Sequence, residues 1–154
     1  MQEYLLPIFL EMLLTFGAAE RTMQFEGYRE CPYPDGVQYA IGYGRAVGKD
    51  EPCTDEKSER LFVVTTLTQH HKVLKARVKG YDQMPKEVKM VLLDMMYNLG
   101  EPRFFKFKNT LTDIENGDYD KASDKLLKSK YARQVKTRAR ANAKLLREAM
   151  NYED

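Results

Sequence analysis

Apolar residues recur at helical spacing along most of the chain, and the first such stretch covers residues 4–19. We expect a first helix from near Pro7 to about Phe25, because proline suits the first turn of a helix. Glu3 and Glu11 charge this stretch, which argues against a cleavable signal peptide and against a stable membrane span. The stretch therefore predicts a buried, amphipathic helix, with a weak membrane-associating anchor as the alternative.

One segment alternates between apolar and other residues instead, and it runs from Tyr33 to Gly48. Gly27 and the Cys-Pro-Tyr-Pro run of residues 31–34 should end the first helix before it. A period of two, punctuated by glycines, is typical of strands. The segment therefore predicts a β-hairpin or a small sheet.

A long helix is expected next, from a Thr54 N-cap to about Lys79, before Gly80. Roughly 24 residues at 1.5 Å each would span about 36 Å, which is long enough to join two lobes. Its apolar positions at helical spacing are Leu61, Val64, Leu67, Leu74 and Val78, and His71 lies in the same line.

Four shorter helices complete the expected elements, at about residues 85–100, 108–116, 119–128 and 136–150. The fold class is therefore α+β and mostly helical. We expect one domain over residues 1–154. Its small lobe covers about residues 20–60, the connecting helix about 55–79, and the helical lobe about 80–154 together with the N-terminal helix.

Composition agrees with a soluble, packed protein: 43% of the 154 residues are apolar, 31% are charged, and the mean hydropathy is −0.60. The net charge of +2 hides an asymmetry, because residues 121–147 hold ten Lys or Arg against one acid, Asp124. Such a segment can bind nucleic acid, but Tyr131 is almost its only aromatic residue. We expect a solvated cationic face and no nucleic-acid partner.

The cysteines and histidines of the chain indicate which redox and metal chemistry to expect. Cys31 and Cys53 are expected to be free thiols in a protein made in the cytosol, although a bridge across the base of the alternating segment is possible. His70 and His71 are neighbours that point in different directions on a helix, and their spacing to the cysteines fits no zinc pattern. We expect no metal and no cofactor.

The residues with the clearest chemistry are two carboxylates, Glu26 and Asp35. Glu26 lies where a helix meets a loop, which suits a general acid, and Asp35 lies in a turn where it can act on water. Gly42 and Gly44 would let a substrate approach the backbone closely. Two such carboxylates favour cleavage of a glycosidic bond. A capping Glu and an ordinary turn Asp are the alternative.

Five motifs in the same order resemble the phage-type lysozymes, or endolysins. The first is Glu-Gly, seven further residues and Asp35, followed by Tyr39-Ala-Ile-Gly-Tyr-Gly44. The others are Asp94 to Gly100, Phe107 to Leu111, Lys128 to Tyr131 with Gln134, and Arg138-Ala139. Together they cover about residues 20–147.

This resemblance implies hydrolysis of the β-1,4 bond between N-acetylmuramic acid and N-acetylglucosamine in peptidoglycan. Glu26 would be the general acid, Asp35 would position or activate the water, and Arg138 would pair with Glu26. The implied substrate cleft is lined by Tyr33, Tyr39, Gly42, Tyr43, Asn98, Phe107 and Gln134. The resemblance also implies a monomer, made in the host cytoplasm and released through a holin pore to act on the cell wall.

The chain departs from the family pattern at the position of Ala40, where the family has a threonine whose hydroxyl helps to hold the water. The residue after the last glycine is Arg45, where histidine is common. Three outcomes remain open: Gln38 or Tyr39 replaces the hydroxyl, the enzyme is a lytic transglycosylase that needs no water, or the domain binds peptidoglycan with little turnover.

Overall fold

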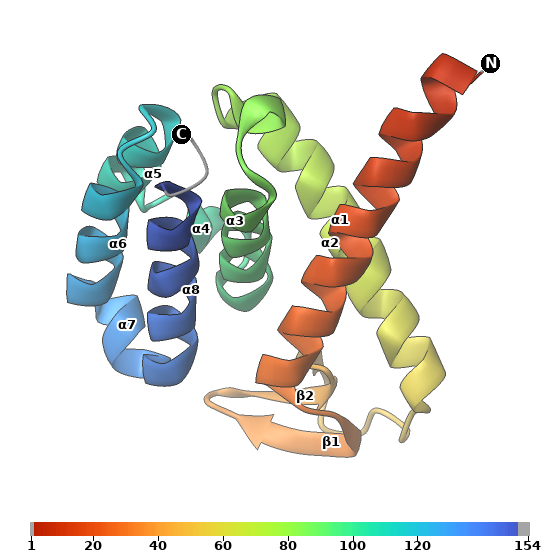
Figure 1. Cartoon of the computed structure of the whole chain (residues 1–154). Coiled ribbons are helices and arrows are strands. Elements are labelled where there is room, and N and C mark those ends of the chain that lie inside the picture. The colour runs from red at the N-terminus through yellow and green to blue at the C-terminus, as the bar shows by residue number, and fades with distance from the viewer. Residues whose placement is uncertain (1, 151–154) are drawn as a thin grey trace. The chain divides into compact units, whose positions relative to one another are not determined.

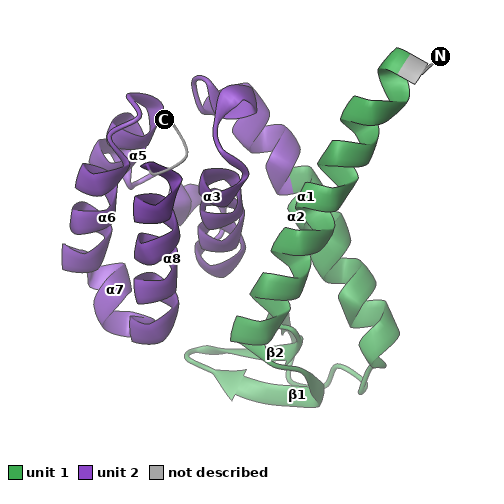
Figure 2. Cartoon of the chain, viewed as in Figure 1, with its two compact units in different colours: residues 1–69 green, residues 70–154 purple. Residues whose placement is uncertain are grey.

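A computed structural model of the chain describes residues 2–150. The chain divides into two compact units, residues 1–69 and residues 70–154, which Figure 2 colours separately. The fold is α+β and mostly helical, as the sequence predicts, with one small antiparallel sheet among the described residues (Figure 1). Within residues 2–150, no helix combines the length and the apolar character needed to cross a membrane.

The first unit holds a long helix, the sheet and the beginning of a second long helix. The elements are α1 (Gln2–Glu26), β1 (Arg29–Asp35), β2 (Gln38–Gly42), β3 (Arg45–Val47) and the first part of α2 (Glu56–Arg77). The three strands are antiparallel in the order β1-β2-β3. In Figure 1, the sheet lies where α1 ends and α2 begins.

Helix α1 differs from the prediction in both its start and its burial. It begins at Gln2, so Pro7 lies inside the helix. The apolar side chains of residues 4–13 are mostly exposed, with Tyr4 77% exposed, so the predicted burial of this stretch is wrong. The buried face begins only at Thr15 and continues at a helical period, because the sheet and α2 offer a partner surface only to the last turns. Its other members are Ala18, Ala19, Thr22 and Met23.

The sheet begins earlier than the alternating pattern indicates. Strand β1 includes Pro32 and Pro34, which a strand tolerates at the edge of a sheet because proline lacks the N–H that a ladder needs. The register of β1 against β2 shifts between Arg29 and Tyr33, so the intervening residues form an irregularity. Gly36 has φ +62° and occupies the first central position of the two-residue turn to β2, as in a type II′ turn.

Helix α2 confirms the expected long helix and corrects its cap. Asp55, rather than Thr54, caps the N-terminus: its Oδ1 accepts a hydrogen bond from the Ser58 N–H at 2.9 Å. Leu61 is 67% exposed, so its predicted place on the buried stripe is wrong. The buried positions are Val63, Leu67, His71, Leu74 and Val78, spaced by four, four, three and four. The boundary between the two units falls inside α2, between residues 69 and 70.

The second unit is helical in all its described elements. After the short 3₁₀ turn η1 (Tyr81–Gln83), it comprises α3 (Lys86–Leu99), α4 (Glu101–Phe104), α5 (Lys108–Glu115), α6 (Tyr119–Lys128), α7 (Lys130–Gln134) and α8 (Lys136–Ala149). The predicted helices are α3, α5, α6 and α8; the short helices α4 and α7 were not predicted. In Figure 1, α8 lies between α6 and α3, and it contacts both.

The core of the second unit centres on α3. The side chains from Val91 to Met96 are all buried, as is Val88. Gly100 ends α3 and donates its N–H to the Met96 carbonyl at 2.8 Å, as its position after the apolar run predicts. His71 belongs to this core too, with its Nδ1 2.9 Å from the Tyr81 hydroxyl.

Candidate active site

Glu26 is the last residue of α1, and its position follows from the way that helix ends. Gly27 has φ +68°, a left-handed conformation that closes helices, and its N–H donates to the Met23 carbonyl at 3.0 Å. Ala19 and Met23 anchor the last turns of α1 in the core. The Glu26 side chain, half-buried, therefore projects from a fixed helix end, which is the setting that the sequence predicts.

Gly44 lies directly against the Glu26 carboxyl group. A Cβ atom at Gly44 would be 2.9 Å from Oε2 of Glu26, and Gly44 also has φ +85°, where L side chains are strained. The turn from β2 to β3 can therefore approach Glu26 only because this residue is glycine. The group that packs against Gly44 is thus the Glu26 side chain of the protein itself rather than a substrate. Gly44 and Glu26 form one packed part of the candidate site.

Tyr33 links the two candidate carboxylates. Burial raises the pKa of the Tyr33 phenol, and the negative charges of Asp35 and then Glu26 raise it further. Asp35, at the exposed end of β1, is two residues from Tyr33 and so on the same face of the strand. The Arg29 guanidinium lies over the Tyr33 ring, 4.4 Å from its centroid. Tyr33 thus keeps its proton at neutral pH and can donate a hydrogen bond.

Ala40 lies in the middle of the sheet, 1% exposed, opposite Tyr33 on β1 and Ala46 on β3. Its methyl group has no donor or acceptor to offer a water molecule. The cross-strand neighbour Tyr33 has a hydroxyl. The sequence suggested Gln38 or Tyr39 as replacements; Gln38 is exposed and pairs with Asp35 at the hairpin turn, and Tyr39 pairs with Pro34.

Arg45 and Glu59 form an ion pair that holds the same turn to α2. Arg45 donates from Nη2 to Oε1 of Glu59 at 2.8 Å and from Nε to Oε2 at 3.1 Å. Glu59 is 2% exposed, and these hydrogen bonds lower the pKa of its carboxyl group. The Glu59 carboxyl group also fills the space beside Gly42, where a Cβ atom would overlap it. Both glycines of the turn therefore lie against carboxylates of the protein.

Two tyrosines beside the strands, Tyr28 and Tyr43, connect the sheet to α2 and to the segment before it. The Tyr43 hydroxyl donates to Oε1 of Glu56 at 2.6 Å, and the Tyr28 ring lies 5.6 Å from the Tyr43 ring, measured between centroids. Burial and then the hydrogen bond to Glu56 raise the pKa of Tyr43. Tyr43 is buried and Tyr39 is half-buried. The expectation that these two residues and Gly42 line a substrate cleft stays a prediction.

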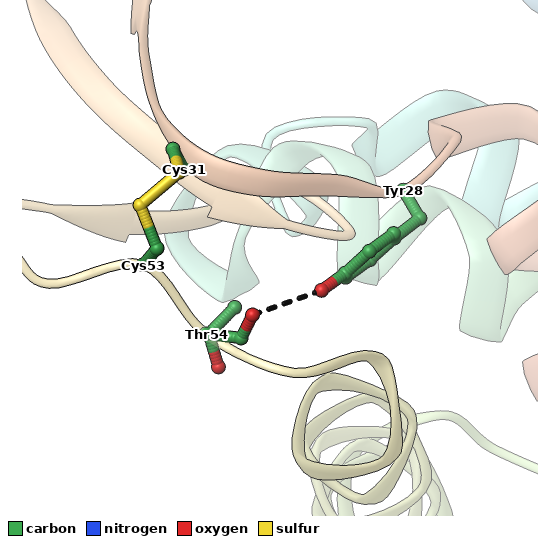
Figure 3. The surroundings of a disulfide bond; sticks show 4 residues. All are labelled: Tyr28, Cys31, Cys53 and Thr54. Atoms are coloured by element: carbon green, nitrogen blue, oxygen red, sulfur yellow. Dashed lines mark hydrogen bonds between the residues drawn. A yellow bond between two sulfur atoms is a disulfide. The ribbon is translucent and has the colours of Figure 1, made fainter.

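A disulfide bond joins Cys31 to Cys53, so the expectation of two free thiols is wrong (Figure 3). The bond ties β1 to the segment before α2 and closes a separation of 22 residues. Two hydrogen bonds lie beside it: the Thr54 N–H donates to the Glu30 carbonyl at 2.8 Å, and the Tyr28 hydroxyl donates to the Thr54 carbonyl at 3.1 Å. Two cysteines alone cannot reveal a pair whose ends meet through the fold.

The remaining candidates lie in the second unit. Arg138 of α8 is buried and donates to Asp94 of α3, from Nη2 to Oδ1 at 2.8 Å and from Nε to Oδ2 at 2.9 Å. Asn142 also donates to Asp94, at 3.0 Å. A buried carboxylate held by three donors orients Arg138 firmly. The pairing of Arg138 with Glu26 stays a prediction.

Three further cleft candidates are spread over the second unit. Asn98 is half-buried in α3, and Gln134 is the exposed last residue of α7. Phe107 meets the Tyr131 ring edge-on, with 6.0 Å between centroids. Their roles toward a substrate stay predictions.

Sequence reasoning missed the residues that orient others. Glu59 and Asp94 were assigned no role from the sequence, yet each is buried and receives two hydrogen bonds from an arginine. A signal was available for Asp94, which stands in an otherwise apolar run of α3. For Glu59, separated from Arg45 by 14 residues, only the folded turn brings the two together.

A small antiparallel sheet beside a helix that ends in a carboxylate, followed by a helical unit, defines a lysozyme-like class of α+β protein. Comparison with known families identifies the family within that class: the model for phage lysozyme matches residues 23–147, and the chain belongs to that family. A search of individually curated proteins finds no match. Membership makes the chain a lysozyme-type glycosidase that degrades cell-wall peptidoglycan.

Proposed function

We propose that the chain hydrolyses the β-1,4 bond between N-acetylmuramic acid and N-acetylglucosamine, with Glu26 as the general acid. The observation that supports this most is the close approach of the Gly44 backbone to the Glu26 carboxyl group at the end of α1. A general acid must be held within hydrogen-bonding reach of the leaving oxygen, and a fixed helix end supplies that constraint.

Asp35 is proposed to orient or deprotonate the attacking water, which would invert the anomeric carbon. Its exposed place at the hairpin turn gives it access to water, and its charge acts on the same Tyr33 hydroxyl as that of Glu26. Reaction on opposite faces of the sugar requires two carboxyl groups with room for a water molecule between them.

Tyr33 is proposed to supply the water contact that Ala40 lacks. It lies opposite Ala40 in the sheet register, its ring is fixed by Arg29, and its hydroxyl keeps its proton. A neutral phenol can donate to one carboxylate and accept from water at once. The Tyr33 hydroxyl of β1 would then replace the hydroxyl that is missing at Ala40 in β2.

A lytic transglycosylase acting on the same bond is the second candidate, and the observation in its favour is the apolar, buried side chain of Ala40. In that reaction the sugar's own hydroxyl attacks and no water is needed. A peptidoglycan-binding domain with little turnover is the third outcome that the same substitution permits.

Mass spectrometry of fragments released from purified peptidoglycan tests these alternatives. Wild type should release reducing muramic ends, and Glu26→Gln should release none while it keeps the melting temperature of wild type. Release of 1,6-anhydro ends would show that the enzyme is a lytic transglycosylase and not a hydrolase. Binding without fragments would replace both by the binding domain, and an active Glu26→Gln variant would refute the assignment of the acid.

A further inference from the structure

The cations between Asp124 and Glu148 are only partly balanced by acids. Between Asp124 and Glu148 the chain has nine Lys or Arg and no acidic residue. Four of the nine pair with acids: Lys125 with Asp113, Arg138 with Asp94, Lys144 with Glu148 and Arg147 with Asp124. Within residues 2–150, the other five make no hydrogen bond or ion pair, and all are exposed: Lys128, Lys130, Arg133, Lys136 and Arg140.

These five residues, which we call the α7 patch, lie within 13 consecutive positions around one short helix. Lys128 ends α6, Lys130 and Arg133 belong to α7, and Lys136 begins α8. Tyr131 and Ala132 anchor α7 in the core, and Ser129 caps it by accepting from the Ala132 N–H at 3.2 Å. The fold therefore fixes the backbone of the patch while its charged side chains stay in solvent.

Two cations of the α7 patch, Lys136 and Arg140, stand where they oppose folding, whereas Lys128 and Arg133 lie in the last turns of α6 and α7, where a cation is favourable. Lys136 stands in the first turn of α8, where a cation opposes the helix dipole at a cost of about 0.3–1 kcal/mol. Lys136 and Arg140 are also like charges four residues apart, which repel each other on a helix. Unpaired cations at costly positions indicate a surface adapted to an external anion.

We propose that the α7 patch binds an anionic cell-wall polymer with repeating phosphodiester charges, close to Gln134 on the same helix. Five cations spread over three helices need several anions in a row, which a polymer supplies and a single carboxylate does not. Arginine and lysine both bind phosphate oxygens well. The inference rests on the proposed function in one respect, namely that the substrate is the cell wall.

A nucleic acid is the less suitable polyanion for this surface. Proteins that bind single strands combine cations with exposed aromatic rings on which bases stack. The aromatic residue within the patch, Tyr131, is 3% exposed and holds α7 in the core. A stacking platform is therefore lacking where the charges are.

The test compares two variants with equal net charge, each in a Glu26→Gln background so that walls stay intact during binding. The patch variant replaces the five residues by glutamine, which takes the net charge from +2 to −3. The control variant makes five Lys→Gln changes at exposed positions outside the patch, with the same net charge: Lys49, Lys57, Lys72, Lys86 and Lys106.

Binding to intact walls that contain the phosphodiester polymer should weaken about tenfold or more for the patch variant at low ionic strength, and less than about twofold for the control. The difference should vanish on walls stripped of the polymer with hydrofluoric acid. An equal loss on stripped walls would overturn the proposal in favour of the carboxylates of the peptide stems.

Two other results would overturn it. If the control variant loses as much binding as the patch variant, net charge alone is responsible. If wild type binds a single-stranded oligonucleotide of equal charge as tightly as the polymer, the surface is a nucleic-acid site or an unselective one. Release of reducing ends by wild type from peptide-free glycan strands is measured separately, so failure of the proposed hydrolase is distinguishable from failure of the patch.

Discussion

At the scale of single residues, the candidate site depends on side-chain atoms that Gly44 and Ala40 lack. Gly44 omits a Cβ atom so that the turn can approach Glu26, and Ala40 omits the hydroxyl expected from the family pattern. Each position has a neighbouring side chain: Glu26 packs on Gly44, and Tyr33, the proposed source of the missing hydroxyl, pairs with Ala40 in the register of the sheet.

Replacing Tyr33 tests the proposed source of the water contact. Tyr33→Phe should lower kcat about tenfold, because one hydrogen-bond donor near the reacting water is lost while the ring remains. Adding Ala40→Thr should restore part of that loss, with melting temperatures as the control for folding. If Tyr33→Phe leaves kcat unchanged, the water is held elsewhere.

Gly44→Ala should lower both stability and activity. The left-handed backbone costs about 1–2 kcal/mol for an L residue, and the new methyl group displaces the Glu26 carboxyl group. Such a displacement should reduce kcat about 100-fold. Gly117→Ala is the matched control, since Gly117 has φ +76° with nothing near its Cβ position. The control should lose similar stability but keep its kcat; equal kcat losses would contradict the contact as the cause.

At the scale of elements, the first unit is held by connections between the sheet and the start of α2. The Arg45–Glu59 pair joins the start of β3 to α2, and the Tyr43–Glu56 hydrogen bond joins the turn between β2 and β3 to the same helix. The disulfide joins β1 to the segment before α2. A three-stranded sheet with an exposed edge has little core of its own, so these links determine its stability.

The Arg45–Glu59 pair predicts an acid-sensitive part of the stability. The hydrogen bonds from Arg45 lower the pKa of Glu59 in the folded state, so the pair stabilises the fold above the unfolded pKa of about 4.3. This contribution is lost as pH falls through the folded pKa. Glu59→Gln should therefore cost about 2 kcal/mol at pH 7. The unfolding curves of wild type and variant should converge as pH falls below the unfolded pKa and through the lower, folded pKa of Glu59.

Denaturant unfolding from pH 7 to pH 3 measures this convergence. Arg45→Gln is the partner variant, because it removes the same pair from the other side and should converge with wild type in the same way. A gap that stays constant across this range would mean that Glu59 contributes through packing beside Gly42 rather than through its charge.

The disulfide predicts a second measurable contribution. Closing a loop of this size stabilises a fold by about 3 kcal/mol, so the Cys31→Ser, Cys53→Ser variant should unfold at a lower denaturant concentration. Reductant should shift the wild-type curve to that of the variant and leave the variant unmoved. If reductant leaves wild type unchanged, the bond adds nothing to stability.

At the scale of the whole molecule, periodicity predicted the elements well and their burial less well. Helices α3, α5, α6 and α8 follow from apolar spacing and from the proline and glycine at the ends of α3. The same spacing placed Leu61 on a buried face, because periodicity identifies a stripe but not the part of it that meets a partner. The predicted burial of the apolar stretch before Thr15 was wrong for the same reason.

The site divides in the same way. The positions of Glu26 at a helix end and of Asp35 at a turn were predictable, because their residue types and the turn signals between them are local in sequence. Their catalytic roles stay predictions. The Cys31–Cys53 bond and the Arg45–Glu59 pair join residues 22 and 14 positions apart. The approach of Gly44 to Glu26 likewise depends on strand register and helix placement, which one sequence does not specify.

The boundary between the units falls inside α2, and this has a consequence for how the molecule unfolds. Helix formation is cooperative. If residues 56–69 of α2 melt together with the first unit, residues 70–77 remain as a short helix that is unstable by itself. The same holds in reverse when α2 melts from its C-terminal end. Each unit therefore loses a helix end when the other unfolds. The two should share one transition in heat or denaturant, and a change that weakens the sheet should reach the amide-exchange rates of His71 and Leu74 as well.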